Sequence, residues 1–147
     1  MTAPIVLGPG DGESAAVGPI SFTIKATGED TNGMYSLVEA NGPTFATPHV
    51  HHAREEAFYV VEGTVTFLAG EDTVTVGAGS YLLVPRETMH GFRSEGDSKI
   101  LITHSPGGFE VFFRELAAAV QRGGMDQAFR DKLAVDVGVT YHDDIAF

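Results

Sequence analysis

The sequence predicts a mainly β protein, a sandwich or barrel of short strands, with helices at its C-terminal end. Short β-prone runs separated by Gly, Pro and Asn-Gly fill the first two-thirds of the chain, a pattern typical of such folds. After Ser105-Pro106-Gly107-Gly108 the apolar residues take up helical spacing instead. No repeat, low-complexity segment or linker separates these parts. We therefore expect a single domain over 1–147, with a barrel core at about 20–105 and a helical extension at about 109–135.

The expected strands follow one another at close spacing. The first covers 20–27 and begins after Gly18-Pro19. The second covers 34–39 and follows Asn32-Gly33, a strong hairpin signal. Glu62-Gly63 predicts a tight reversal between two later strands. The remaining expected strands are 44–51, 56–61, 64–69, 73–76, 80–84, 90–94 and 99–104.

Two helices are expected after the strands. The apolar residues at helical spacing are Phe109, Phe112, Phe113, Leu116, Ala117 and Val120. This stripe is expected to pack on the sheet, although it can also serve as a partner-binding face. Gly123-Gly124 predicts the end of the first helix, and a second is expected from about 125 to 135. The tail, 136–147, carries no clear pattern.

The charge balance disfavours two classes of partner. Nine Lys and Arg stand against 20 Asp and Glu, a formal net charge of -11, so neither nucleic acid nor an anionic membrane is an expected partner. The absence of cysteine excludes disulfides, thiolate metal sites and thiol catalysis. No N-terminal signal and no apolar run near the roughly 20 residues of a membrane span are seen, so a soluble, cytoplasmic protein is expected.

The most informative stretch of the chain is His49-Val-His-His-Ala-Arg-Glu-Glu56. In a strand, His49 and His51 point to the same face. A further imidazole, His90, follows a second run punctuated by Gly and Pro. Imidazoles and a carboxylate are ligand types of first-row divalent metals. The sequence therefore predicts a metal site made of His49, His51, Glu56 and His90.

Glu55 competes with Glu56 for the carboxylate position. If Glu56 is the first residue of its strand, Phe58 shares its inward face and Glu55 points away. Glu56 is therefore preferred. His52 has the wrong parity and is expected near solvent or behind the ligands. His104 is assigned a structural role ahead of lining the cavity, and His142 is assigned no role.

The expected cofactor is one divalent metal ion per chain. Neutral imidazole and carboxylate suit Fe, Mn, Ni, Co or Zn and do not choose between them. Four protein ligands leave positions for water, substrate or dioxygen only if the metal is five- or six-coordinate. A closed four-coordinate site would be structural.

Two motifs in this chain resemble those of the cupin superfamily. The first is a Gly, a gap, His-x-His, a gap, Glu, six residues and Gly, read here from Gly42 through His49, His51 and Glu56 to Gly63. Its first gap is one residue longer than usual. The second is read from Gly79 through Pro85 to His90 and Ser94, with Glu87 in place of the usual Gly and Ser94 in place of the usual Asn. Neither departure falls on a metal ligand of the family.

The resemblance covers about residues 20–105 and implies a double-stranded β-helix, or jelly roll, with C-terminal helices. Within the superfamily the chain looks most like quercetin-dioxygenase-type monocupins. That likeness implies a dioxygenase acting on a small enolic or flavonol-like substrate, with Glu56 as both ligand and base. Strand parity places Phe45, Thr47, Phe58 and Phe92 around the metal. Met34, Ser36 and Val38 join them if Glu39 faces solvent.

Two other functions remain open from the sequence. Related barrels isomerise, epimerise, decarboxylate or cyclise small molecules with the metal as Lewis acid. Others only bind a metal or a small molecule. A homodimer is also expected, with the segment Ile5-Val6-Leu7 added to a partner's sheet edge or with the 109–120 helix at the contact.

Overall fold

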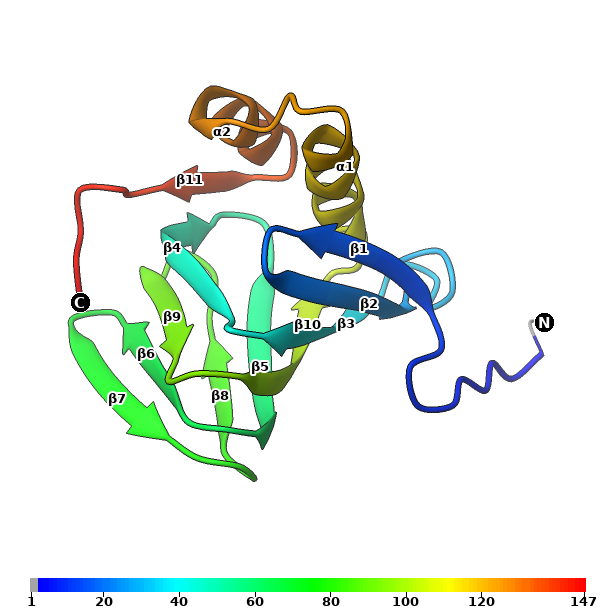
Figure 1. The fold of residues 1–147 in the computed structure, drawn as a ribbon, viewed down its shortest axis with the longest axis horizontal. Helices are drawn as coiled ribbons and strands as arrows, with labels where there is room; N and C mark the ends of the chain where they lie inside the picture. Colours follow the sequence, from blue (N-terminus) through cyan, green and yellow to red (C-terminus); the bar gives the residue numbers. More distant parts are fainter. Residues whose placement is uncertain (1–2) are drawn as a thin grey trace.

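Two antiparallel β-sheets, face to face, form the body of the computed structural model, which describes residues 3–147 (Figure 1). The six-stranded sheet has the order β1 (Glu13–Val17), β2 (Ile20–Ala26), β3 (Ser36–Gly42), β10 (Ser98–Ser105), β5 (Glu55–Glu62) and β8 (Tyr81–Val84). The five-stranded sheet has the order β11 (Val139–Tyr141), β4 (Phe45–His51), β9 (His90–Ser94), β6 (Val65–Ala69) and β7 (Asp72–Val76). The predicted jelly roll is confirmed.

Alternating burial along the strands builds the core between the sheets. In β10 the residues Ile100, Ile102 and His104 are buried while their neighbours are partly exposed. In β5 the buried positions are Glu56, Phe58 and Val60. Because side chains alternate between the two faces of a strand, each sheet presents one apolar face inward.

The two helices lie together beyond one end of the sheets (Figure 1). In α1 (Glu110–Gln121), the residues Phe112, Phe113 and Leu116 are buried, and the Phe113 ring lies 4.4 Å from that of Phe22 in β2. The expected packing of the Phe stripe on the barrel is thus confirmed. Asp126 caps α2 (Gln127–Asp136) because its carboxylate accepts a hydrogen bond from the Phe129 amide. Neither helix of residues 3–147 is long and apolar enough to cross a membrane.

Two strands were not expected from the sequence. β1 forms a hairpin with β2, in which Val17 pairs with Ile20. β11 consists of three residues and pairs with the end of β4, so that Tyr141 lies opposite His49. A strand this short shows no periodicity, and its pairing with β4 is what makes it one.

The start of the second expected strand was wrong by two residues. Met34 lies in the turn before β3 and is exposed. The segment Ile5-Val6-Leu7 is also exposed and forms no strand.

The turn before β9 depends on an unusual backbone conformation. Glu87 has φ of 65°, in the left-handed region that glycine adopts without strain. Its amide donates to the His51 carbonyl, 2.9 Å away, and its carboxylate contacts His52. These bonds offset the backbone cost and hold the turn next to the end of β4.

Candidate metal centre

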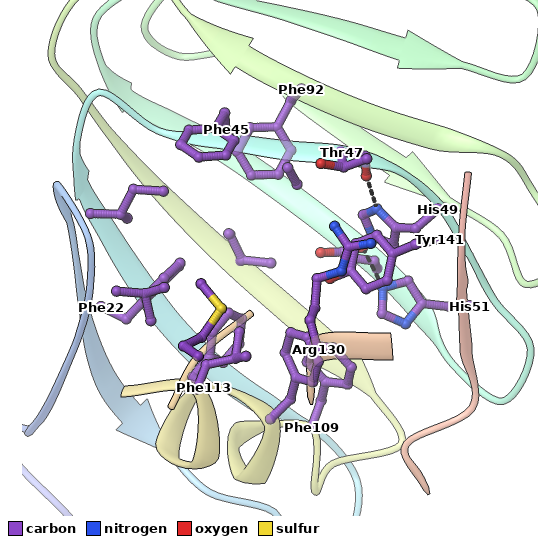
Figure 2. A pocket seen from close by; sticks show the side chains of 18 residues that line it. Phe22, Phe45, Thr47, His49, His51, Phe92, Phe109, Phe113, Arg130 and Tyr141 are labelled. Carbon is purple, nitrogen blue, oxygen red and sulfur yellow. Dashed lines mark hydrogen bonds and ion pairs between the residues drawn. The ribbon is translucent and has the colours of Figure 1, made fainter. Parts of the chain in front are cut away.

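The four predicted metal ligands come together at one end of the barrel. His49 and His51 end β4, Glu56 lies at the start of β5 and His90 begins β9. β4 and β9 are paired so that His49 lies opposite His90. All four side chains are buried, and each offers one ligand atom within 4.8 Å of the others. Figure 2 shows His49 and His51 beside a pocket that reaches toward α1.

One oxygen of Glu56 faces all three imidazoles. Glu56 Oε2 lies 2.6 Å from His90 Nε2, 2.9 Å from His51 Nε2 and 3.6 Å from His49 Nε2. The donor set of three Nε2 atoms and one carboxylate oxygen is suited to a first-row divalent metal.

Backbone carbonyls orient two of these imidazoles. His49 Nδ1 lies 2.7 Å from the Thr47 carbonyl and His90 Nδ1 lies 2.9 Å from the Thr88 carbonyl. A carbonyl only accepts, so Nδ1 of each ring is a donor, and Nε2 is the atom that a metal would use. His51 differs, because neither of its buried ring nitrogens makes an aligned hydrogen bond within residues 3–147. A buried, unpartnered imidazole aimed at a carboxylate is what a bound metal would satisfy, so the residues present fit a metal ion.

At His49, His51 and Glu56 the electrostatics favour the protonation state that a metal requires, and at His90 they do not. Burial lowers the pKa of both His49 and His51, which keeps them neutral. Burial alone would raise the pKa of Glu56, but the nearby His104 and His51 hold it well below its usual range. Burial likewise opposes protonation of His90, yet the hydrogen bond to Glu56 raises its pKa in the metal-free protein.

His104 lies against the cluster, next to Glu56. Its side chain is buried, and Nε2 lies 3.1 Å from Glu56 Oε1, the oxygen that does not face the other imidazoles. The register between β10 and β5 places the two residues opposite each other. The contact is close but poorly aligned as a hydrogen bond, and the His104 ring stacks on Phe109 at 4.2 Å. The alternation Ile100, Ile102, His104 was the signal in the sequence that could have placed it inward.

A mainly apolar cavity of about 210 Å³ opens from the cluster. Phe45, Thr47 and Phe92, expected around the metal from strand parity, line it. Two other expected residues do not. Phe58 lies in the barrel core, 5.1 Å from Phe67 between ring centroids, and Met34 lies in an exposed turn. Ser36 and Val38 are buried but do not line the cavity.

Much of the cavity wall comes from outside the β-strand motifs. Besides Ala46 of β4, the lining residues that were not expected from the sequence are Val17, Ile20, Phe22, Ile102, Phe109, Phe112, Phe113, Leu116, Met125, Arg130 and Tyr141. They belong to the first hairpin, β10, the helices and the final strand. Figure 2 shows the Arg130 side chain lying across Tyr141, with Phe109 and Phe113 below.

The remaining polar candidates lie outside the cluster. Glu55 is exposed, in agreement with the preference for Glu56. His52 is exposed and bridges Glu87 and Thr140, with ring nitrogens 2.9 Å from each. The His142 side chain makes no hydrogen bond within residues 3–147, although its amide donates to the Pro48 carbonyl.

Residues 36–105 match the family model of the cupin domain. The chain belongs to the cupin superfamily. A quercetin 2,3-dioxygenase from Bacillus subtilis is 32% identical to this cupin over 116 residues, which make up 77% of this chain and 34% of that protein. This cupin therefore spans about a third of the length of that relative.

Solved structures of other cupins superpose on this one. KdgF from Halomonas sp. has a TM-score of 0.65 at 22% identity, covering 75% of this chain and 99% of that one. An RmlC-like cupin from Shewanella frigidimarina has a TM-score of 0.64 at 18% identity, covering 75% and 96%. The nucleoside dehydratase Pac13 has a TM-score of 0.59 at 18% identity, covering 74% and 88%. At these identities the likeness establishes the fold alone.

Proposed function

We propose that this cupin is a metal-dependent dioxygenase acting on a small enolic substrate with an apolar, ring-containing body. The observation that carries the proposal is a buried three-His, one-Glu cluster that opens into a mainly apolar cavity. The likeness to a quercetin 2,3-dioxygenase supports the proposed reaction with dioxygen.

In this proposal His49, His51, His90 and Glu56 hold one divalent metal ion. When bound, a redox-active ion of this kind supplies Lewis acidity for an enolate oxygen and the redox capacity that dioxygen chemistry needs. Glu56 is ionised at neutral pH because neighbouring imidazoles hold its pKa low. That state allows it to bind a cation and to accept the hydroxyl proton of the substrate.

The cavity walls position the substrate and exclude water. Phe22, Phe109 and Phe113 offer aromatic faces to a flat ring. Because the wall is mainly apolar, an enolic oxygen of the substrate would find its main polar partner at the bound metal, and this orients the substrate.

The size of the cavity narrows the substrate class. About 210 Å³ is below the roughly 300–1,000 Å³ of pockets that hold drug-sized ligands. Phe45 at its edge is more than half exposed, so a longer substrate would extend past it into solvent. We therefore favour a compact one- or two-ring enol over a fully enclosed flavonol.

Metal analysis of the purified protein, followed by oxygen uptake with a panel of hydroxyketones and flavonols, tests the proposal. We expect about one divalent ion per chain and oxygen consumption that depends on substrate. A metal-loaded protein that consumes no oxygen with any member of the panel would refute the dioxygenase.

A second candidate function is non-redox chemistry at the same cluster, such as isomerisation, decarboxylation or cyclisation. The ligand set favours it equally well, because three imidazoles and a carboxylate also suit Zn, which carries no redox chemistry. Stoichiometric metal, no oxygen uptake and conversion of an enolisable substrate under nitrogen would identify this function.

A further inference from the structure

Tyr141 places a phenol beside the four candidate metal ligands. It ends up there because β11 pairs with β4, with Tyr141 opposite His49 and the two ring centroids 5.3 Å apart. The side chain lines the cavity, and its hydroxyl takes part in none of the side-chain hydrogen bonds among residues 3–147. A hydroxyl at a cavity wall without a protein partner is available to a ligand.

The Tyr141 ring is held in place from several sides. The guanidinium carbon of Arg130 lies 3.9 Å from the ring centroid, within the range of a cation–π contact (Figure 2). Arg130 is anchored in turn by Asp131 and Asp143, both 2.7 Å from its Nη2. The Phe112 ring stacks at 6.4 Å. This packing restricts the ring, so little rotational entropy remains to be lost on binding.

The hydroxyl is a donor at neutral pH. A phenol ordinarily loses its proton only at about pH 10, so at neutral pH the Tyr141 hydroxyl carries the proton that it would donate. Arg130, a charged donor on the same wall, already donates to carboxylates through Nε and Nη2.

We propose that the Tyr141 hydroxyl determines substrate specificity by donating a hydrogen bond to a second oxygen of the substrate, next to the oxygen that faces the cluster. The substrate class is then a compact ring compound with a hydroxyl and a carbonyl on adjacent carbons. This inference rests on the proposed function, because the first oxygen needs a metal at His49, His51, Glu56 and His90.

Equilibrium binding to the Zn²⁺-loaded protein tests the inference without turnover. The probe is maltol, a single-ring hydroxyketone whose absorbance changes when its hydroxyl is ionised. Phenol serves as the matched probe with one oxygen. We expect Tyr141→Phe to raise the Kd of maltol about tenfold, the size of one lost hydrogen bond, and to leave that of phenol unchanged. Zn²⁺ affinity, measured by chelator competition, should not change.

The control variant is Tyr81→Phe, which removes a hydroxyl from an exposed residue of β8 and should bind both probes like the wild type. Equal maltol binding by wild type and Tyr141→Phe, with full Zn²⁺ in both, would overturn this inference and leave the proposed function untouched. Equal weakening of maltol and phenol would overturn it too, because that indicates a deformed cavity. A wild-type protein that takes up no metal would instead refute the proposed function and the inference with it.

Discussion

The two ends of the barrel contain cavities of similar volume that differ in the ionisable side chains lining them. The cavity at the metal cluster is about 210 Å³ and the one at the other end is about 200 Å³. Both are mainly apolar. The second is lined by Phe58, Val60, Phe67, Val74, Val76, Ser80, Tyr81 and Leu82, and holds no imidazole or carboxylate.

Strand β5 contributes to both cavities, with Glu56 at the first and Phe58 and Val60 at the second. Along β5 the inward residues run from Glu56 to Phe58 and Val60, and along β10 they run from His104 to Ile102 and Ile100. The inward residues of each strand therefore keep the same two-residue spacing, but they change from polar near the metal site to apolar deeper in the barrel. The comparison teaches that the convergence of polar groups, and not cavity volume, marks the functional end.

Replacing one of the four candidate metal ligands should have the largest effect of all, the loss of metal binding. His90→Ala is expected to abolish metal binding because it removes one of the four candidate ligands. The barrel should stay folded, because the rings of His49 and Phe58 still pack around the position. Metal content by elemental analysis and folding by circular dichroism measure the two outcomes. The matched control is His52→Ala, an exposed imidazole outside the cluster, which should keep its metal. Full metal occupancy in His90→Ala would remove His90 from the ligand set.

At the apolar end, Phe58→Ala should reduce stability without removing metal. Its side chain is 1% exposed and packs on Phe67 and Phe92, so we expect a loss of about 3–5 kcal/mol in the free energy of unfolding. Denaturant titration measures this loss. Phe45→Ala, at a position 55% exposed, should change the stability by about 0.5 kcal/mol or less. If Phe58→Ala lost its metal as His90→Ala does, metal binding would depend on the apolar end of the barrel as well as on the ligands.

His104 tests how far the metal site extends along β10. His104→Phe removes the nitrogen beside Glu56 Oε1 but preserves a ring to stack on Phe109. We expect metal affinity, measured by chelator competition, to fall about 10–100-fold, as for other groups that orient ligands. His104→Gln retains a donor and should recover part of the loss. Wild-type metal affinity in His104→Phe would support the structural role predicted from the sequence.

The smallest expected effect is on the pH dependence of the metal-free protein. The pKa values of His49 and His51 are lowered from 6.5 by burial, so below about pH 6.5 the unfolded chain binds protons that the folded state does not. Stability should therefore fall as pH decreases from 7.5 to 5.5. The lowered pKa of Glu56 acts in the same direction at lower pH, and the raised pKa of His90 opposes it.

Denaturant titrations at pH 7.5 and 5.5 measure this change. Stability that stays constant or rises toward pH 5.5 would mean that His90 outweighs His49 and His51.

Sequence reasoning identified most of the barrel because its strands are separated by clear turn signals. Within residues 3–147, nine of the eleven strands and both helices were expected close to their observed bounds. The two that were missed, β1 and β11, lie outside the cupin motifs, and β11 has only three residues. Parity also placed Phe58 on the correct inward face, but it carries no information about depth, and the side chain lies in the core.

By itself, the sequence determined the jelly roll and the four clustered ligands. Strand parity put His49 and His51 on one face, and the resemblance to the cupin motifs added Glu56 and His90 to them. Only the tertiary structure decided the rest of the site. His104 reaches Glu56 through the register of β10 against β5, and Tyr141 reaches His49 because β11 pairs with β4. Such contacts join residues 48 and 92 positions apart, and no local pattern encodes the pairing that brings them together.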